Sequence, residues 1–202
     1  MINFSEHPLV GTDWLAEHLT DSNLRIVDMR WRGDGSGREV YQAGHIPGAI
    51  HLDWQRDLNW TDERGLRDLL LPPERFAAVM EAAGIGSDSL VLAYAETDRS
   101  GATRLWWALR YYGHDQVAVL NGGWTKWVAE GRVVDTGVPQ PLPAIFTSRP
   151  RPSWLATADE IEHAVNNELV KGLASSSGKL VLPHNFSEQH LTIFCGGVGQ
   201  EE

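Results

Sequence analysis

The fold of this 202-residue chain is decided by residues 89–131, which read SLVLAYAETDRSGATRLWWALRYYGHDQVAVLNGGWTKWVAEG. Their apolar periodicity predicts, in order, a strand over 89–94, a helix over 100–112, a strand over 117–120 and a helix over 123–130. Such alternation is typical of a parallel sheet with helices on both faces, joined by right-handed crossovers. Because reactive loops of these sheets lie beyond the carboxyl ends of the strands, the natural site is the loop 95–99.

The residues before this stretch continue the alternation. Thr12 is the expected N-cap of a short helix, and residues 24–28 are the next expected strand. Residues 49–52 predict another short strand. Pro73 suits the first turn of a helix that ends at Gly84. The first domain is therefore expected to span residues 1–132.

Composition and charge exclude several classes of partner. Seventeen basic residues against 27 acidic ones give a net charge of −10, which opposes binding to nucleic acid and to anionic membrane surfaces. No apolar run approaches the roughly 18 residues of a membrane span, and the first residues lack the basic and apolar regions of a signal peptide. A cytoplasmic location is expected. The single cysteine fits a reducing compartment, because it cannot form an intrachain disulfide.

A change in composition marks a domain boundary. Residues 133–153 contain five prolines among short polar residues, which is typical of a semi-extended linker. A capping-box pattern at 157–160 then opens a new helical periodicity. We therefore expect a second unit over residues 154–202.

Three stretches together resemble the rhodanese sulfurtransferases in sequence, order and spacing. They are YQAGHIPGAI at 41–50, RLWWALRYYGH at 104–114 and VLNGGWTKW at 119–127. The resemblance implies an α/β fold: a rhodanese-like parallel sheet with helices on both faces, followed by an incomplete second rhodanese-like unit. The Trp106–Trp107 pair and the proline-rich linker resemble the first half of the two-domain thiosulfate and 3-mercaptopyruvate sulfurtransferases.

The resemblance also implies the chemistry. In this family an active-site cysteine takes a sulfane sulfur from a small anionic donor, such as thiosulfate or 3-mercaptopyruvate. It becomes a persulfide and passes the sulfur to a thiol or cyanide, with no cofactor and no metal. Tandem members carry this cysteine in the second domain, and the first is usually catalytically empty. The first domain here fits that pattern, because Ala95, or Asp98 in a shifted alignment, stands where the nucleophile would be. Glu96 and Asp98 would repel an anionic donor, partly offset by Arg99 and the following helix N-terminus.

Cys195 is therefore the candidate catalytic residue. It follows an apolar run and precedes Gly196, Gly197, Val198 and Gly199, the candidate anion-binding loop, which resembles the family's catalytic loop. Two interpretations stay open: a persulfide-forming nucleophile, or an inert buried thiol. Only seven residues follow Cys195, too few for a loop and a helix that would lower its pKa. A truncated second domain is expected, and the sequence leaves open whether the C-terminus is native or results from a disrupted reading frame.

Alternative functions rest on weaker patterns. A non-catalytic rhodanese-like module that binds or regulates a partner is the main rival. A phosphatase of the same fold would need a cysteine six residues before an arginine, where Arg104 has Asp98. The set of His184, His190 and Cys195 lacks the paired spacing of a zinc site. Two features are expected to be structural: Asp28 and Arg30 as an ion pair or loop anchor, and His45 as a turn and packing residue.

Overall fold

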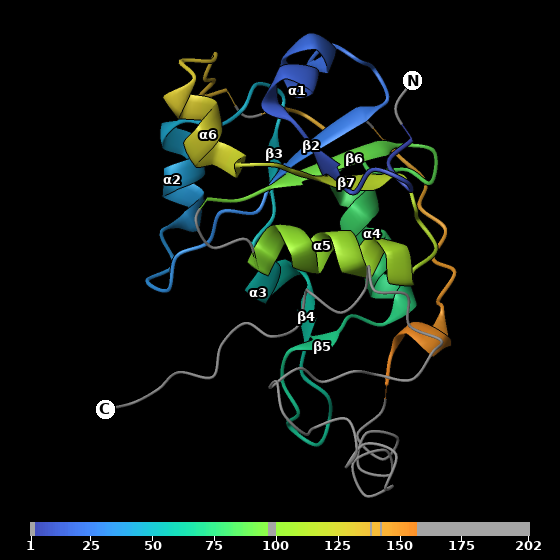
Figure 1. The fold of residues 1–202 in the computed structure, drawn as a ribbon. Coiled ribbons are helices and arrows are strands. Elements are labelled where there is room, and N and C mark those ends of the chain that lie inside the picture. Colours follow the sequence, from blue (N-terminus) through green and yellow to red (C-terminus); the bar gives the residue numbers. More distant parts are fainter. Residues whose placement is uncertain (1–2, 97–99, 138, 142, 157–202) are drawn as a thin grey trace, which may run out of the picture. The chain divides into compact units, whose positions relative to one another are not determined.

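A five-stranded parallel sheet forms the centre of the first unit (Figure 1), with strand order β1-β7-β6-β2-β3. The computed structural model describes residues 3–96, 100–137, 139–141 and 143–156. The elements of this unit, in chain order, are β1 (Leu9–Val10), α1 (Thr12–His18), β2 (Leu24–Asp28), α2 (Gly37–Ala43), β3 (Ile50–His51), α3 (Trp54–Asp57), β4 (Asn59–Trp60), β5 (Leu69–Leu70), α4 (Pro73–Ala82), β6 (Leu90–Tyr94), α5 (Ser100–Tyr111), β7 (Val117–Leu120) and α6 (Gly123–Ala129).

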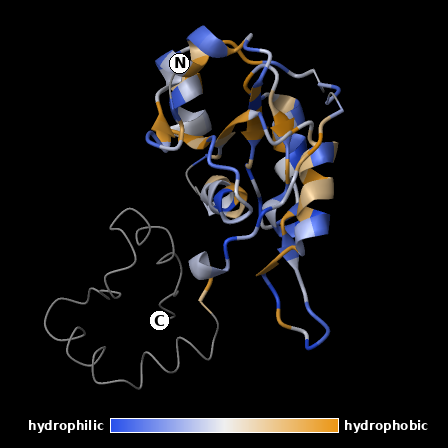
Figure 2. Ribbon diagram, turned by 90° about the vertical axis from the view of Figure 1, so that its right-hand side faces the viewer, coloured by the Kyte–Doolittle hydropathy of each residue, from blue (hydrophilic) through white to orange (hydrophobic). Residues whose placement is uncertain are grey.

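Helices cover both faces of the sheet, as the alternation predicts. Figure 1 shows α1 and α6 on one side and α4 and α5 on the other. On the first side Leu15 and Trp127 belong to one buried cluster with Leu92 and Tyr94 of β6. The strands of a parallel sheet are buried on both faces, so all five residues of β6 are buried and read as a continuous apolar run. Figure 2 shows the same concentration of hydrophobic residues in the strands.

The predicted strands and helices of residues 89–131 are confirmed, with ends shifted by a residue at most. The expected capping role of Thr12 is wrong. Helix α1 begins at Thr12 itself, and Gly11 is the extended N-cap residue, whose carbonyl accepts from the amide of Leu15 at 3.2 Å. Because Thr12 is already the first helical residue, its hydroxyl does not cap the helix as the side chain of an N-cap residue would, and the residue is fully buried.

An antiparallel hairpin of β4 and β5 lies between α3 and α4, where the sequence carries no prediction. Arg104 of α5 holds it: the Nη2 atom donates to Asn59 Oδ1 at 2.9 Å and to the carbonyl of Asp68 at 2.8 Å. Arg104 is thus engaged with the hairpin. The phosphatase alternative, which needs this arginine at an anion-binding loop, gains no support from these contacts.

Part of the stretch 133–153, expected to be a linker, packs on the sheet unit. His45 and Asp135 form a two-way backbone bridge, with N–O distances of 2.8 and 2.9 Å. Phe146 is buried against the rings of Phe76 and His114. The first compact unit accordingly runs from Met1 to Pro150.

The second unit begins at Arg151. Its described residues form one short 3₁₀ turn, Pro152–Trp154, with the Arg151 guanidinium 5.3 Å from the Trp154 ring centroid. The predicted helix after 157, Cys195 with its glycine loop, and the His184–His190–Cys195 set lie outside the described residues. In the described part of the chain, no helix is both long and apolar enough to cross a membrane.

Candidate functional site

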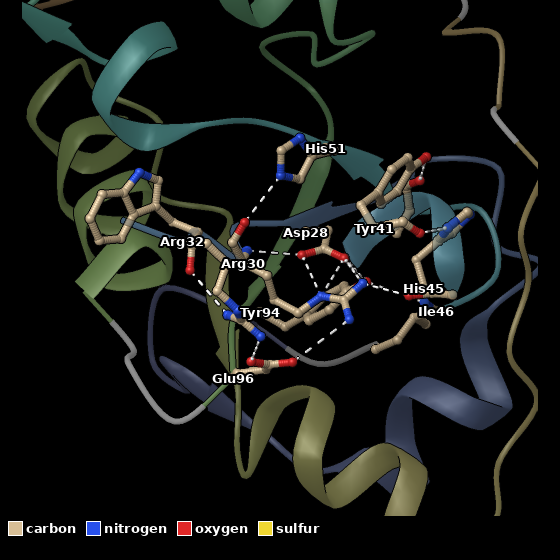
Figure 3. A network of polar contacts seen from close by, with 12 residues as sticks. Asp28, Arg30, Arg32, Tyr41, His45, Ile46, His51, Tyr94 and Glu96 are labelled. Carbon is tan, nitrogen blue, oxygen red and sulfur yellow. Dashed lines mark hydrogen bonds and ion pairs between the residues drawn. The ribbon is translucent and has the colours of Figure 1, made fainter. Parts of the chain in front are cut away.

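The functional side chains gather where the parallel strands β2, β3 and β6 end. Asp28, the last residue of β2, pairs in register with His51 on β3 and with Tyr94 on β6. Parallel strands bring their carboxyl ends to one edge of a sheet, so residues 51 and 94 become direct neighbours of residue 28 there. Figure 3 shows the polar network that results.

A buried ion pair forms the centre of this network. Arg30 Nε lies 3.0 and 2.9 Å from the two carboxylate oxygens of Asp28, and Arg30 Nη2 lies 2.6 Å from Oδ2. The same Nη2 donates to the carbonyl of Gly44 at 2.6 Å. Both side chains are at most 1% exposed. The hydrogen bonds between the two side chains compensate much of the cost of burying two charges. The contact itself confirms the expected ion pair of Asp28 and Arg30.

Tyr94 joins the ion pair to the loop before β3. Its hydroxyl donates to Asp28 Oδ2 at 2.7 Å and accepts from the amide of Ile46 at 3.2 Å. Burial raises the pKa of Tyr94 well above its usual value, and the negative charge of Asp28 acts in the same direction. Tyr94 therefore keeps its proton and remains a donor to the carboxylate.

The two histidines of the network have structural roles. His45 is fully buried, stacks on Tyr41 with ring centroids 4.1 Å apart, and its Nδ1 lies 2.8 Å from the Tyr41 carbonyl. His51 Nε2 lies 3.1 Å from the carbonyl of Arg30. In each case a carbonyl can only accept, so the ring nitrogen is the donor. These contacts agree with the packing role expected of His45.

The backbone at the end of β6 is held from two sides. The amide of Met29 donates to the Tyr94 carbonyl at 2.8 Å, and the amide of Trp124 donates to the Ala95 carbonyl at 2.9 Å. The Trp124 ring also lies 4.1 Å from the Arg30 guanidinium carbon. Ala95, one of the two positions at which the resemblance to rhodanese places the nucleophile, is thus buried and held by these contacts.

A cavity of about 200 Å³ opens beside this network. Two guanidinium groups meet one carboxylate there: Arg32 Nη2 donates to Glu96 Oε2, and Arg30 Nη1 lies 4.0 Å from Glu96 Oε1. We call it the Glu96 cavity; it is lined by Met29, Arg30, Trp31, Arg32, Trp54, Glu96, Ser100 and Gly101. Glu96 was expected to repel an anion, and in the structure its charge is matched by Arg32 and Arg30.

Several residues predicted for the site fall outside the described chain: Asp98, Arg99, Cys195, Gly196, Gly197, Val198 and Gly199. Arg32 and Tyr94 belong to this site although no sequence motif pointed to them. Tyr94 could have been found, since it ends an apolar strand with a polar group at the predicted site. Within the described residues, no group of three His, Cys, Asp or Glu side chains is arranged to hold a metal ion.

The family model of the rhodanese-like domain matches residues 11–130, which include the whole network and the strands β2, β3, β6 and β7. The chain belongs to the rhodanese family. The rhodanese sheet with helices on both faces is therefore established for the first unit. Its solved relatives include a crystal structure of SseA from Escherichia coli, described as showing the rhodanese fold of 3-mercaptopyruvate sulfotransferases. That structure matches with a TM-score of 0.74 and 30% identity over 80% of this chain and 62% of the other.

Curated relatives of this rhodanese chain are named for sulfur transfer. Sulfur carrier protein TtuD of Thermus thermophilus is 36% identical over 170 residues, which are 82% of this chain and 56% of the relative. Thiosulfate sulfurtransferase of Bos taurus is 35% identical over 162 residues, 76% of this chain and 54% of the relative. 3-Mercaptopyruvate sulfurtransferase of Escherichia coli K12 is 36% identical over 132 residues, 63% and 46% of the two chains. The chain spans about half the length of these relatives.

Proposed function

We propose that this rhodanese chain takes part in sulfur transfer from thiosulfate or 3-mercaptopyruvate to a thiol or cyanide, with Cys195 as the sulfur carrier. The observation that carries the proposal is the fixed Ala95 at the end of β6. The first unit has no thiol at the position of the family's nucleophile, and Cys195 is the chain's one cysteine. The names of the relatives support the class of reaction.

The proposed reaction has two steps. The Cys195 thiolate attacks the outer sulfur of thiosulfate; an S–S bond forms to Cys195 while the S–S bond of thiosulfate breaks, and sulfite leaves with the electron pair. Cyanide then attacks the outer sulfur of the persulfide, thiocyanate leaves, and the thiolate is restored. With 3-mercaptopyruvate the C–S bond breaks instead, and the carbon that loses sulfur takes up a proton to give pyruvate.

In this proposal the first unit is a support without a catalytic group. Its Asp28–Arg30–Tyr94 network fixes the carboxyl ends of β2 and β6, and its described residues include no cysteine. The small anionic donor and the acceptor would be bound by the residues around Cys195, with Gly196, Gly197, Val198 and Gly199 as the proposed anion-binding loop. We further propose that the protein acts in the cytoplasm and that residues 154–202 belong to a second rhodanese-like unit.

The test is to incubate the full chain with thiosulfate, and separately with 3-mercaptopyruvate, and to measure thiocyanate after adding cyanide. Intact-mass spectrometry before the cyanide step should show one added sulfur atom. Cys195→Ser should lose both signals, whereas Ala95→Ser, altered at the empty position of the first unit, should keep them. Absence of persulfide and thiocyanate in the folded wild type would refute the proposal.

The second candidate function is a non-catalytic rhodanese module that binds a partner. The observation that favours it is Glu96, whose carboxylate stands in the cavity at the end of β6 and is paired with Arg32. This alternative would be supported if the wild type shows no turnover and binds the same protein partner as its Cys195→Ser variant.

A further inference from the structure

We propose that the Glu96 cavity is a binding site for a small oxyanion, and that the Glu96 carboxylate is the internal anion that fills it. The inference concerns the first unit alone and does not depend on sulfur transfer at Cys195. It rests on the two guanidinium groups, the position of the helix α5 N-terminus and the size of the cavity.

The two arginines are arranged to hold one anion between them. Arg30 is fixed: its Nε and Nη2 are used by Asp28 and Gly44, which leaves Nη1 directed to Glu96 Oε1 at 4.0 Å. Arg32 approaches the other oxygen, Oε2, through its Nη2. Each guanidinium thus meets a different oxygen of the same carboxylate (Figure 3). A free oxyanion would be bound by the same donors, since planar guanidinium groups match the oxygens of carboxylate, sulfate and phosphate.

Glu96 supplies the carboxylate that faces both arginines in the cavity. Among the described residues of this network the cations are Arg30 and Arg32, and the anions are Asp28 and Glu96. Asp28 is bound to Arg30 and does not line the cavity. Without Glu96, Arg32 loses the ion pair that it makes in the described part of the chain. Ser100 and Gly101, the first residues of the 12-residue helix α5, line the same cavity and add the positive end of its dipole.

The size of the cavity restricts the ligand to a small ion. Its volume of about 200 Å³ is below the roughly 300–1,000 Å³ of sites for drug-sized ligands. Trp31 and Trp54 form part of its wall, with ring centroids 5.6 Å apart in an edge-to-face arrangement. A trigonal or tetrahedral oxyanion fits such a space, and the two indoles provide spectroscopic probes of its occupation.

Glu96 competes with any free anion because it is tethered to the chain. A tethered group acts at an effective concentration in the millimolar range or above, so a free anion must displace it before it can bind. The wild type is therefore expected to bind sulfate weakly. Removing the carboxylate should expose the site and leave space for a free anion in its place.

The experiment compares the wild-type chain with Glu96→Ala in titrations with sodium sulfate and with sodium formate, at constant ionic strength set by chloride. Binding is followed by isothermal titration calorimetry and by the indole N–H resonances of Trp31 and Trp54 in ¹H–¹⁵N spectra. Glu96→Ala should bind both anions at least about tenfold more tightly than the wild type. Formate should also raise the Tm of Glu96→Ala more than that of the wild type, because it replaces the missing carboxylate.

Two further variants decide the interpretation. Glu96→Ala combined with Arg32→Gln should lose the gained affinity, because one of the two donors is removed. Glu63→Ala, at an exposed carboxylate of the β4–β5 hairpin, should bind like the wild type. The proposal is overturned if folded Glu96→Ala gains no affinity for either anion, or if the double variant keeps the gain. Glu96→Gln, which keeps the side-chain shape without the charge, serves the same test should Glu96→Ala unfold.

Discussion

The carbonyl oxygen of Ala95 occupies the space that a side chain on Gly123 would need. Gly123 begins α6 with a φ of +55°, and the amide of the next residue, Trp124, donates to that same oxygen at 2.9 Å. The end of β6 and the start of α6 therefore approach closely because residue 123 has no Cβ. This contact holds the backbone that leads to Glu96.

Substitution Gly123→Ala should lower the free energy of unfolding by about 3 kcal/mol. The new methyl group would overlap the Ala95 carbonyl, and alanine is strained at positive φ. Urea denaturation followed by tryptophan fluorescence measures the change. Gly131→Ala is the matched control: its φ is +68° and nothing lies within 4 Å of an added Cβ. Only the backbone strain then applies, about 1 kcal/mol, and equal losses in the two variants would contradict the steric argument.

Removing the charge of Asp28, or the hydrogen bond that Tyr94 donates to it, should lower the free energy of unfolding. Asp28→Asn leaves the buried guanidinium of Arg30 with the Glu96 carboxylate, 4.0 Å away, as its nearest counter-charge, so we expect the free energy of unfolding to fall by about 3 kcal/mol. Tyr94→Phe removes one hydrogen bond to Asp28 and one from Ile46, and it should cost about 1–3 kcal/mol. Both changes are measured by chemical denaturation at neutral pH.

The control for this prediction is an ion pair on the surface. The Nζ atom of Lys126, in α6, lies 3.6 Å from Oε1 of Glu130, the residue directly after this helix. Both residues are exposed. Lys126→Gln should cost less than about 0.5 kcal/mol, because exposed ion pairs are screened by solvent. A cost for Asp28→Asn as small as that for Lys126→Gln would show that burial of the pair is not what stabilises it.

The sequence predicts the sheet well because its strands are buried on both faces. Residues 90–94 and 117–120 are unbroken apolar runs, and glycines follow the helices α5 and α6. The Glu96 cavity could not be predicted in the same way. Its charged groups, Arg32 and Glu96, are 64 positions apart, and they meet only because β2 pairs with β6. A single sequence does not show which strands are neighbours in the sheet.

The hairpin shows a second limit of sequence reasoning. Strands β4 and β5 have two residues each, which is too short for a period-two pattern to be visible. What fixes them is a long-range contact, the guanidinium of Arg104. The resemblance to rhodanese places residue 104 in a helix but does not indicate that its side chain reaches residues 59 and 68.

Arg104→Lys should loosen the hairpin without opening the sheet. The Nη2 atom of Arg104 donates to Asn59 Oδ1 and to the carbonyls of Asp68 and Leu69, and a lysine amine cannot reproduce this fork. Hydrogen exchange of amides in residues 59–70 should accelerate by about tenfold, while that of β6 stays as in the wild type. Arg67→Lys, at an exposed position of the same hairpin, should leave both regions unchanged. Uniform acceleration across the sheet would mean that Arg104 stabilises the whole unit instead.

His114 should make the stability of the first unit depend on pH. The residue follows Gly113 after α5, is 5% exposed, and its amide donates to the Leu109 carbonyl at 2.8 Å. Burial lowers the pKa of His114 below its ordinary value of 6.5. Below that value the unfolded chain binds a proton that the folded chain does not, so the free energy of unfolding falls as the solution becomes more acidic. Above it, both states are neutral and the contribution is constant.

The free energy of unfolding is measured by urea denaturation at about pH 7.5, pH 6.5 and pH 5.5. The wild type should lose stability between the two lower values, and His114→Gln should lose less over the same interval because it has no group to protonate. His7→Gln is the control, since residue 7 is exposed and its side chain meets water in both states. If His114→Gln shows the same loss as the wild type and His7→Gln, the acid sensitivity arises from other groups and burial of His114 does not cause it.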